Sequence, residues 1–137
     1  MQSRPVEPGR SSAIVYPRGS DTRPSAQNLL IFVEAGGRVR AACDGVSIAD
    51  SRGALIVREL SHSRVFYFPR GDVRLDLFTA VTQTSHCPRK GDASYFAFGD
   101  ADGPAIAWSY EDPIAKAEPI RGYIAFYEDQ ITLEVED

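Results

Sequence analysis

The fold class follows from the stretch Arg38-Val39-Arg40-Ala41-Ala42-Cys43-Asp44-Gly45-Val46-Ser47-Ile48. The apolar residues at positions 39, 41 and 43 share one strand face, and the arginines at 38 and 40 share the other. Asp44-Gly45 is a strong signal for a type I′ turn, which needs a positive φ at both central residues. Positions 46 and 48 then continue the inward face. This stretch therefore predicts an antiparallel hairpin with one buried side.

The same period of two recurs along the rest of the chain. Further strands are expected at 29–34, 54–59, 64–68, 73–78, 93–98, 104–110, 121–127 and 130–136. In the last strand, Ile131, Leu133 and Val135 are predicted to point inward. Gly36-Gly37 predicts a hairpin turn after the first strand, and the one helical candidate, 114–118, is closed by Pro119.

This pattern predicts a mainly β protein with a single β domain. The expected architecture is an antiparallel β-sandwich or a partly open β-barrel, with at most one or two short helical turns. Residues 28–137 form this domain in our interpretation. Residues 1–27 hold four prolines among arginine, serine and glycine, which predicts a flexible N-terminal arm. Within the arm, Ile14-Val15-Tyr16 is a candidate edge strand.

Composition narrows the classes of partner. The formal net charge is −4 over 137 residues, which argues against nucleic-acid binding because a phosphate backbone selects a basic face. The longest apolar run, 29–33, is too short to span a membrane. The N-terminus lacks the apolar segment of a signal peptide, and the two cysteines form no CxxC pair. We therefore expect a cytoplasmic protein with free thiols, and exposed strand edges make a homodimer a candidate assembly.

The most reactive side chains lie in the stretch Thr84-Ser85-His86-Cys87-Pro88-Arg89-Lys90-Gly91-Asp92. Neighbouring cations favour a thiolate, so Cys87 is a candidate nucleophile. Lys90 beside Gly91 is a candidate anion-binding or catalytic group. The competing interpretations are a cysteine that only packs within the turn, and a solvated lysine at a hairpin turn where Gly91 supplies the positive φ.

Aromatic residues recur on strands that also carry small residues. Small inward residues leave room for a ligand, and tyrosine or tryptophan adds polar tips to an apolar wall. We expect a pocket walled by Tyr67, Tyr95, Trp108, Tyr110 and Tyr127, with Arg70 and Lys90 orienting a polar or anionic small molecule. The alternative is that these rings simply fill the core. The four possible soft donors, His62, His86, Cys43 and Cys87, have no ligand-pair spacing, so no metal or cofactor is expected.

The chain resembles the bacterial family called domain of unknown function four-two-seven over residues 38–135. The residues that carry the resemblance are, in chain order, Ala49-Asp50-Ser51, Ala54-Leu55, Tyr67-Phe68-Pro69-Arg70, Asp72-Val73, Thr84, Cys87-Pro88, Lys90-Gly91-Asp92-Ala93-Ser94-Tyr95, Ala107-Trp108-Ser109-Tyr110, Pro113 and 120–127. Arg89 stands where the family often has an aromatic residue, and Phe96 where it often has tryptophan. The resemblance implies a small, mainly β, cytoplasmic protein with no settled activity.

A nucleotidyltransferase label is attached to that family, and this activity needs clustered carboxylates that hold Mg²⁺. Asp72 and Asp76 share a face of the expected strand 73–78, but Arg74 lies between them, which is more typical of a solvated charge ladder. This activity is therefore the least favoured. The sequence favours a ligand-binding β-module, and the alternative is an enzyme that uses Cys87 or Lys90 on a small substrate.

Overall fold

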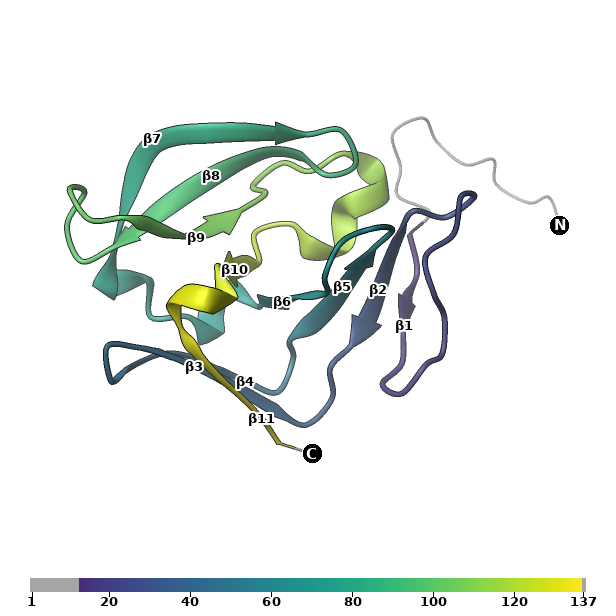
Figure 1. Ribbon diagram of the computed structural model, residues 1–137, viewed down its shortest axis with the longest axis horizontal. Coiled ribbons are helices and arrows are strands. Elements are labelled where there is room, and N and C mark those ends of the chain that lie inside the picture. Colours follow the sequence, from purple (N-terminus) through teal and green to yellow (C-terminus); the bar gives the residue numbers. More distant parts are fainter. Residues whose placement is uncertain (1–12, 137) are drawn as a thin grey trace, which may run out of the picture.

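Two β-sheets build the fold in the computed structural model, which describes residues 13–136 (Figure 1). The larger sheet has eight strands in the order β1-β2-β5-β6-β10-β9-β8-β7, and the smaller has three in the order β11-β3-β4. The strands are β1 (Val15–Tyr16), β2 (Leu30–Glu34), β3 (Arg38–Cys43), β4 (Val46–Ser51), β5 (Leu55–Glu59), β6 (Val65–Phe68), β7 (Phe78–Cys87), β8 (Gly91–Phe98), β9 (Ala105–Ser109), β10 (Ile124–Phe126) and β11 (Thr132–Glu136). This arrangement confirms the predicted mainly β class, as two packed sheets rather than a closed barrel.

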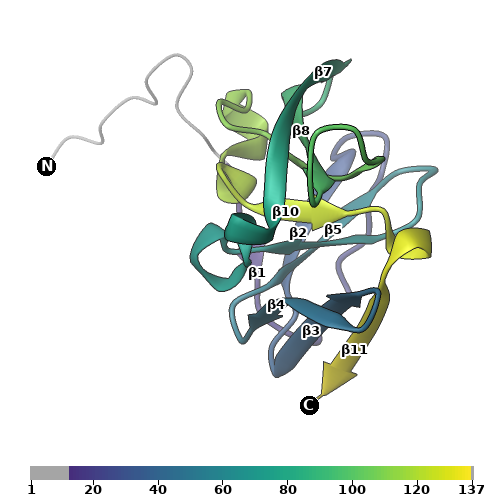
Figure 2. The ribbon, with the colours of Figure 1, turned by 90° about the vertical axis from the view of Figure 1, so that its left-hand side faces the viewer.

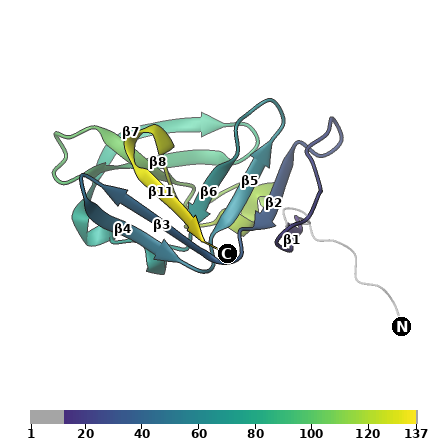
Figure 3. The same cartoon turned by 60° about the horizontal axis from the view of Figure 1, so that its bottom comes forward.

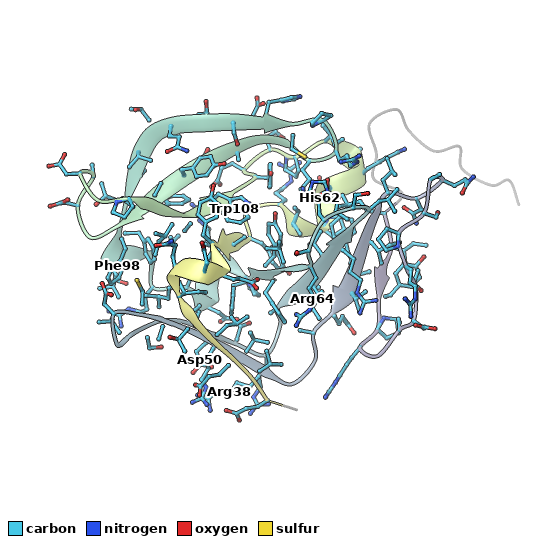
Figure 4. All side chains as sticks on the ribbon, viewed as in Figure 1. Arg38, Asp50, His62, Arg64, Phe98 and Trp108 are labelled. Atoms are coloured by element: carbon cyan, nitrogen blue, oxygen red, sulfur yellow. The ribbon has the colours of Figure 1, made fainter. Side chains whose placement is uncertain are left out.

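The hairpin of β3 and β4 forms as its sequence predicts. Asp44 and Gly45 have φ values of 51° and 79°, as a type I′ turn requires. On the outer face, Arg38 pairs with Asp50 at 2.6 Å, and both side chains lie on that face in Figure 4. Cross-strand ion pairs of this kind fix the register between neighbouring strands. One detail is wrong, because Val46 is exposed rather than inward.

The main core lies between the two sheets. It joins Val39, Ala41 and Ile48 of the small sheet to Phe68 and Phe126 of the large one. Figure 2 shows the small sheet lying on one side of β10 and the β7–β8 hairpin on the other. The large sheet therefore has a second face, turned away from the small sheet, on which a separate cluster of side chains is built.

Gly36-Gly37 does not close a hairpin, contrary to the prediction. Both glycines have a positive φ, 64° and 55°, but the chain passes here from β2 in the large sheet to β3 in the small sheet. The small sheet is completed by β11, which comes from the far end of the chain and lies beside β3 (Figure 3). Turn residues signal a change of direction but not which strands will pair.

The strand expected at 73–78 is also wrong. This part of the chain forms two 3₁₀ turns, η1 (Arg70–Asp72) and η2 (Leu75–Leu77). Its alternating apolar residues do pack against the main core. The pattern therefore predicted correctly which residues are buried, but it did not predict the backbone conformation. The strand in this region is β7, which begins at Phe78 where the predicted strand ends, and its residues are mostly exposed because it lies at the sheet edge. An exposed strand shows little alternation of apolar and polar residues, so its sequence does not reveal it.

Helical turns are more numerous than the one or two expected, because η3 (Ala115–Ile120) and η4 (Glu128–Gln130) join η1 and η2 in the described chain. The turn η3 covers 115–118 of the predicted helical segment 114–118 and continues to Ile120, so Pro119 lies inside it rather than closing it. At the C-terminus, Ile131 and Leu133 pack against the core, but Val135 is 54% exposed. The strand β11 runs past the core at this point, so the inward orientation predicted for Val135 is wrong.

The predicted edge strand at 14–16 is present as β1, which pairs with β2 in parallel. Predictions for residues 1–12 lie outside the described residues. Between residues 13 and 136 there is no helix with the length and apolar character needed to cross a membrane.

Candidate functional site

A single cross-strand row places the aromatic residues on the second face of the large sheet. Leu55 of β5 pairs with Tyr67 of β6, which pairs with Ala125 of β10. Ala125 in turn pairs with Trp108 of β9, and Trp108 with Tyr95 of β8. Facing residues of paired strands project to the same side of a sheet. Residues far apart in the sequence therefore meet in one row.

This row borders a cavity of about 260 Å³. The cavity is lined by Val57, Glu59, His62, Ser63, Val65, Tyr67, Lys90, Tyr95, Trp108, Tyr110 and Tyr127. Figure 4 shows Trp108 and His62 on the same side of the molecule, away from the small sheet. All five aromatic residues predicted to wall a pocket meet here, together with Lys90. Cys87 and Arg70 do not line the cavity.

The cavity has a closed end and an open end. Tyr67 and Tyr110 are buried, with 1% and 6% of their surface exposed, while Tyr127 is 40% exposed. His62 and Ser63 are exposed as well. The aromatic residue Tyr127 and the loop at 62–63 therefore form the mouth, and the buried tyrosines form the floor.

Ring contacts fix the position of Trp108. Its ring centroid lies 4.8 Å from that of Tyr127 and 6.3 Å from that of Tyr67, with the second pair edge to face. The indole Nε1 donates a hydrogen bond of 3.2 Å to the Tyr67 hydroxyl. Ala125 lies between these two residues in the register, and its small side chain leaves space for this contact. The aromatic wall is therefore held by neighbours rather than free to rotate.

Two hydroxyl groups at the floor keep unused donor capacity. The Tyr67 oxygen accepts from Trp108, and no acceptor for the Tyr67 proton is present among residues 13–136. The Tyr110 hydroxyl has no hydrogen-bond partner in that same range. Burial raises the pKa of both tyrosines, so both hydroxyls stay protonated at neutral pH. Each can donate a hydrogen bond, and neither has a protein acceptor within the described range.

A buried ion pair closes one side of the cavity. The Lys90 Nζ lies 2.6 Å from Glu59 Oε1, and Arg89 Nη1 lies 2.8 Å from Glu59 Oε2. Both Lys90 and Glu59 are buried, with 8% and 9% of their surface exposed. Burial alone would raise the pKa of Glu59, but the hydrogen bond and charge of Lys90, together with Arg89, hold that pKa below its ordinary value. The carboxylate is therefore ionised and fully paired.

This ion pair requires the large sheet to curl. Glu59 ends β5, and Lys90 lies in the turn before β8, with β6, β10 and β9 between these strands in the sheet. In a flat sheet, four strand spacings would separate them by roughly 19 Å. The observed contact of 2.6 Å instead brings the β7–β8 turn back over the face of the sheet. The cavity is the space enclosed by this curl.

The turn that carries Lys90 is anchored from two sides. The Lys90 carbonyl accepts a hydrogen bond from the Ile114 amide at 2.9 Å, and the Lys90 amide donates to the Cys87 carbonyl at 3.1 Å. Gly91 follows with a φ of 119°, a conformation that favours glycine. The prediction that Gly91 supplies a positive φ is confirmed. The expected alternative of a solvated Lys90 is wrong, because this lysine is buried by the Glu59 contact.

Cys87 lies beside the ion pair rather than in the cavity wall. Its thiol is half-buried and unbonded to other cysteines, and Lys90 Nζ donates to its Sγ at 3.6 Å. His86 points elsewhere, since its Nδ1 lies 2.7 Å from Asp92 Oδ1 on the exposed side of the hairpin. The arrangement gives Cys87 one cationic neighbour and no imidazole base.

Arg70 and the acidic residues are engaged outside the cavity. Arg70 pairs with Glu111 at 3.0 Å, so the structure does not bring it to the aromatic wall. Asp72 accepts a hydrogen bond from Ser51 at 2.6 Å, and Asp76 pairs with Arg74 at 2.8 Å. Because 70–77 forms two turns, Asp72 and Asp76 do not share a strand face as predicted.

Over residues 13–136, histidine, cysteine and acidic side chains form no group of three suited to a metal.

Five lining residues were not predicted as part of the site, namely Val57, Glu59, His62, Ser63 and Val65. Glu59 continues the inward alternation of Leu55 and Val57, which are both buried, so the period of two could have identified it. His62 lies in the loop after β5, where no periodicity applies. Its Nδ1 lies 2.9 Å from the Leu60 carbonyl, which can only accept a hydrogen bond. Nδ1 is therefore the donor, and Nε2 has no hydrogen-bond partner in the described part of the chain and lies at the cavity mouth.

The fold and the site together define a small two-sheet β protein with an aromatic cavity. Residues 32–137 match the family described as Domain of unknown function (DUF427), and the chain belongs to this family. No curated protein matches the chain.

Replacing Lys90 by alanine should destabilise the protein by about 3 kcal/mol, because removing one partner leaves a buried carboxylate with only Arg89 to pair it. The exposed Lys116 provides the control, and Lys116→Ala should change stability by less than about 0.5 kcal/mol. Urea unfolding of the three proteins measures both changes. Equal stabilities for the two variants would contradict the buried ion pair.

The contribution of Glu59 to stability should be lost in acid. A carboxyl group whose pKa is lowered in the folded state stabilises the protein above its ordinary pKa of 4.5, and this contribution disappears as the pH falls through the lower folded value. The free energy of unfolding of the wild type should therefore approach that of Glu59→Gln on acidification from about pH 6 to about pH 3. A difference that stays constant over this range would show that Glu59 does not titrate as described.

Proposed function

We propose that the protein is a small-molecule-binding module and that its ligand occupies the cavity beneath the β7–β8 turn. The observation that carries this proposal is the polar floor of the cavity, where the hydroxyl groups of Tyr67 and Tyr110 have no acceptor within the described chain. Each of these hydroxyls can donate a hydrogen bond to a molecule bound in the cavity. A polar ligand in this cavity supplies the missing acceptors.

The competing interpretation, that the rings only fill a core, accounts less well for these features. A core of aromatic residues closes on itself, as Phe68 and Phe126 do between the two sheets. The second face of the large sheet instead leaves about 260 Å³ open, with an exposed mouth and a polar floor. Apolar walls with a few convergent polar groups are typical of small-molecule sites.

Enzymatic activity through Lys90 or Cys87 is the second candidate. It is favoured by the ammonium of Lys90, which borders the cavity and lies 3.6 Å from the Cys87 thiol. A Cys87→Ala variant separates the two functions, because a binding module keeps its ligand whereas an enzyme that uses this thiol binds but no longer turns over. The nucleotidyltransferase activity has little support, because Asp72 and Asp76 are already paired with other residues.

We also propose a reducing, cytoplasmic location and a homodimer. The location is supported by two free cysteines, Cys43 and Cys87.

The dimer is supported by β7, a ten-residue edge strand without lysine, arginine or acidic residues. Long uncharged edges readily pair with another strand.

Ligand binding should change the fluorescence of Trp108, because it is the only tryptophan in the chain and it lines the cavity. We expect at least one member of a panel of small aromatic and aliphatic acids, amines and alcohols to produce a saturable change. Val65→Phe, which fills the cavity from a half-buried lining position, should weaken that binding at least about tenfold.

The matched control is Val81→Phe. Val81 is also half-buried and packs against the same cluster, but it does not line the cavity. This variant should bind as the wild type does. If no member of the panel binds, or if Val65→Phe binds as tightly as Val81→Phe, the proposed binding site is wrong.

A further inference from the structure

We infer that the cavity selects a planar aromatic molecule that carries a carboxylate or carbonyl oxygen, with the oxygen at the floor and the ring against Trp108. This inference rests on the proposed function and specifies its ligand class. It follows from three properties of the lining: which hydrogen-bonding roles are free, what charge surrounds them, and how the rings are arranged.

The free groups at the floor can all donate a hydrogen bond. The Tyr67 oxygen already accepts the indole N–H of Trp108, which leaves its own proton to be donated. Tyr110 lines the cavity and offers a second hydroxyl, which has no hydrogen-bond partner within residues 13–136. Lys90 has three N–H groups, of which one bonds Glu59 and one points to the Cys87 sulfur. Three convergent donors select an oxygen acceptor with several lone pairs.

The charge near the floor is positive. Glu59 has one oxygen bonded to Lys90 and the other to Arg89, so its negative charge is offset twice, and the three side chains together carry one positive charge. Aromatic cages commonly bind cations, because a ring face attracts positive charge. In this cavity the Lys90 ammonium already lies 5.7 Å from the centre of the Tyr110 ring. A ligand cation would meet a like charge, whereas an anion would be attracted.

The walls favour a flat ligand. Tyr95 and Trp108 are neighbours across β8 and β9, and Val57 and Val65 are neighbours across β5 and β6. All four line the same cavity, so an aromatic side and an aliphatic side border the space above the row of strands. A planar ring makes the largest contact with both sides and gains the additional stabilisation of ring pairing.

Two aromatic probes of similar size and opposite charge test this class. Benzoate and benzylamine are titrated into the wild-type protein near neutral pH, with the fluorescence of Trp108 as the signal. We expect saturable binding of benzoate, and at least tenfold weaker binding of benzylamine. Cyclohexanecarboxylate has the same charge as benzoate without the flat ring, and it should also bind more weakly than benzoate.

A hydroxyl deletion tests the predicted orientation. Tyr110→Phe removes one floor donor but keeps the ring, and a hydrogen bond to a charged group is lost, so affinity for benzoate should fall about tenfold or more. Tyr123→Phe is the control, because Tyr123 lies outside the cavity lining. This variant should bind benzoate as the wild type does.

The outcomes separate this inference from the proposed function. Binding of benzylamine at least as tight as that of benzoate, or equal benzoate affinity in Tyr110→Phe and Tyr123→Phe, overturns the ligand class. In either case, loss of the tighter probe in Val65→Phe would still support a ligand site in this cavity. If neither probe nor any member of the wider panel binds, both the ligand class and the proposed function fall.

Discussion

The contact between Lys90 and Glu59 determines the shape of this protein beyond its strand pairing. Hydrogen bonds between neighbouring strands would form equally well in a flatter sheet, but an ion pair of 2.6 Å across four strand spacings would not. The contact also has to offset the desolvation of two charges. Arg89 contributes here, because it satisfies the second carboxylate oxygen. The curl therefore depends on a small group of charged residues at one edge of an aromatic cluster.

The chemistry of the cavity follows from this closure. The curl brings the Lys90 ammonium over the sheet, and the cross-strand row brings Tyr67, Trp108 and Tyr95 beneath it. Burial keeps the floor hydroxyls protonated. Glu59 pairs with two cations, so this group of three side chains has a net positive charge. The cavity combines apolar walls with donors at one end, which is a selective arrangement for a polar ligand.

The sequence predicted the parts of the fold that leave a burial pattern. The β3–β4 hairpin, the class of fold and the aromatic lining all rest on period-two alternation, and this periodicity is local. It failed where long-range pairing decides the structure, as in the crossover at Gly36-Gly37 and in the exposed edge strand β7. Arg70 was also expected in the pocket as a group that orients an anion, but it pairs with Glu111 instead. Lys90 was predicted at the site, but its ion pair with Glu59 was not, because the period of two can place Glu59 on the inward face but cannot link residues 31 positions apart.

A double-mutant cycle on this ion pair tests the central claim most directly. It compares the free energies of unfolding of the wild type, Glu59→Gln, Lys90→Ala and the double variant. If the two side chains are in contact across the curled sheet, their effects should be non-additive by about 1–3 kcal/mol. Effects that add to within about 0.5 kcal/mol would mean that the side chains do not interact, and the closure of the sheet would then need another cause.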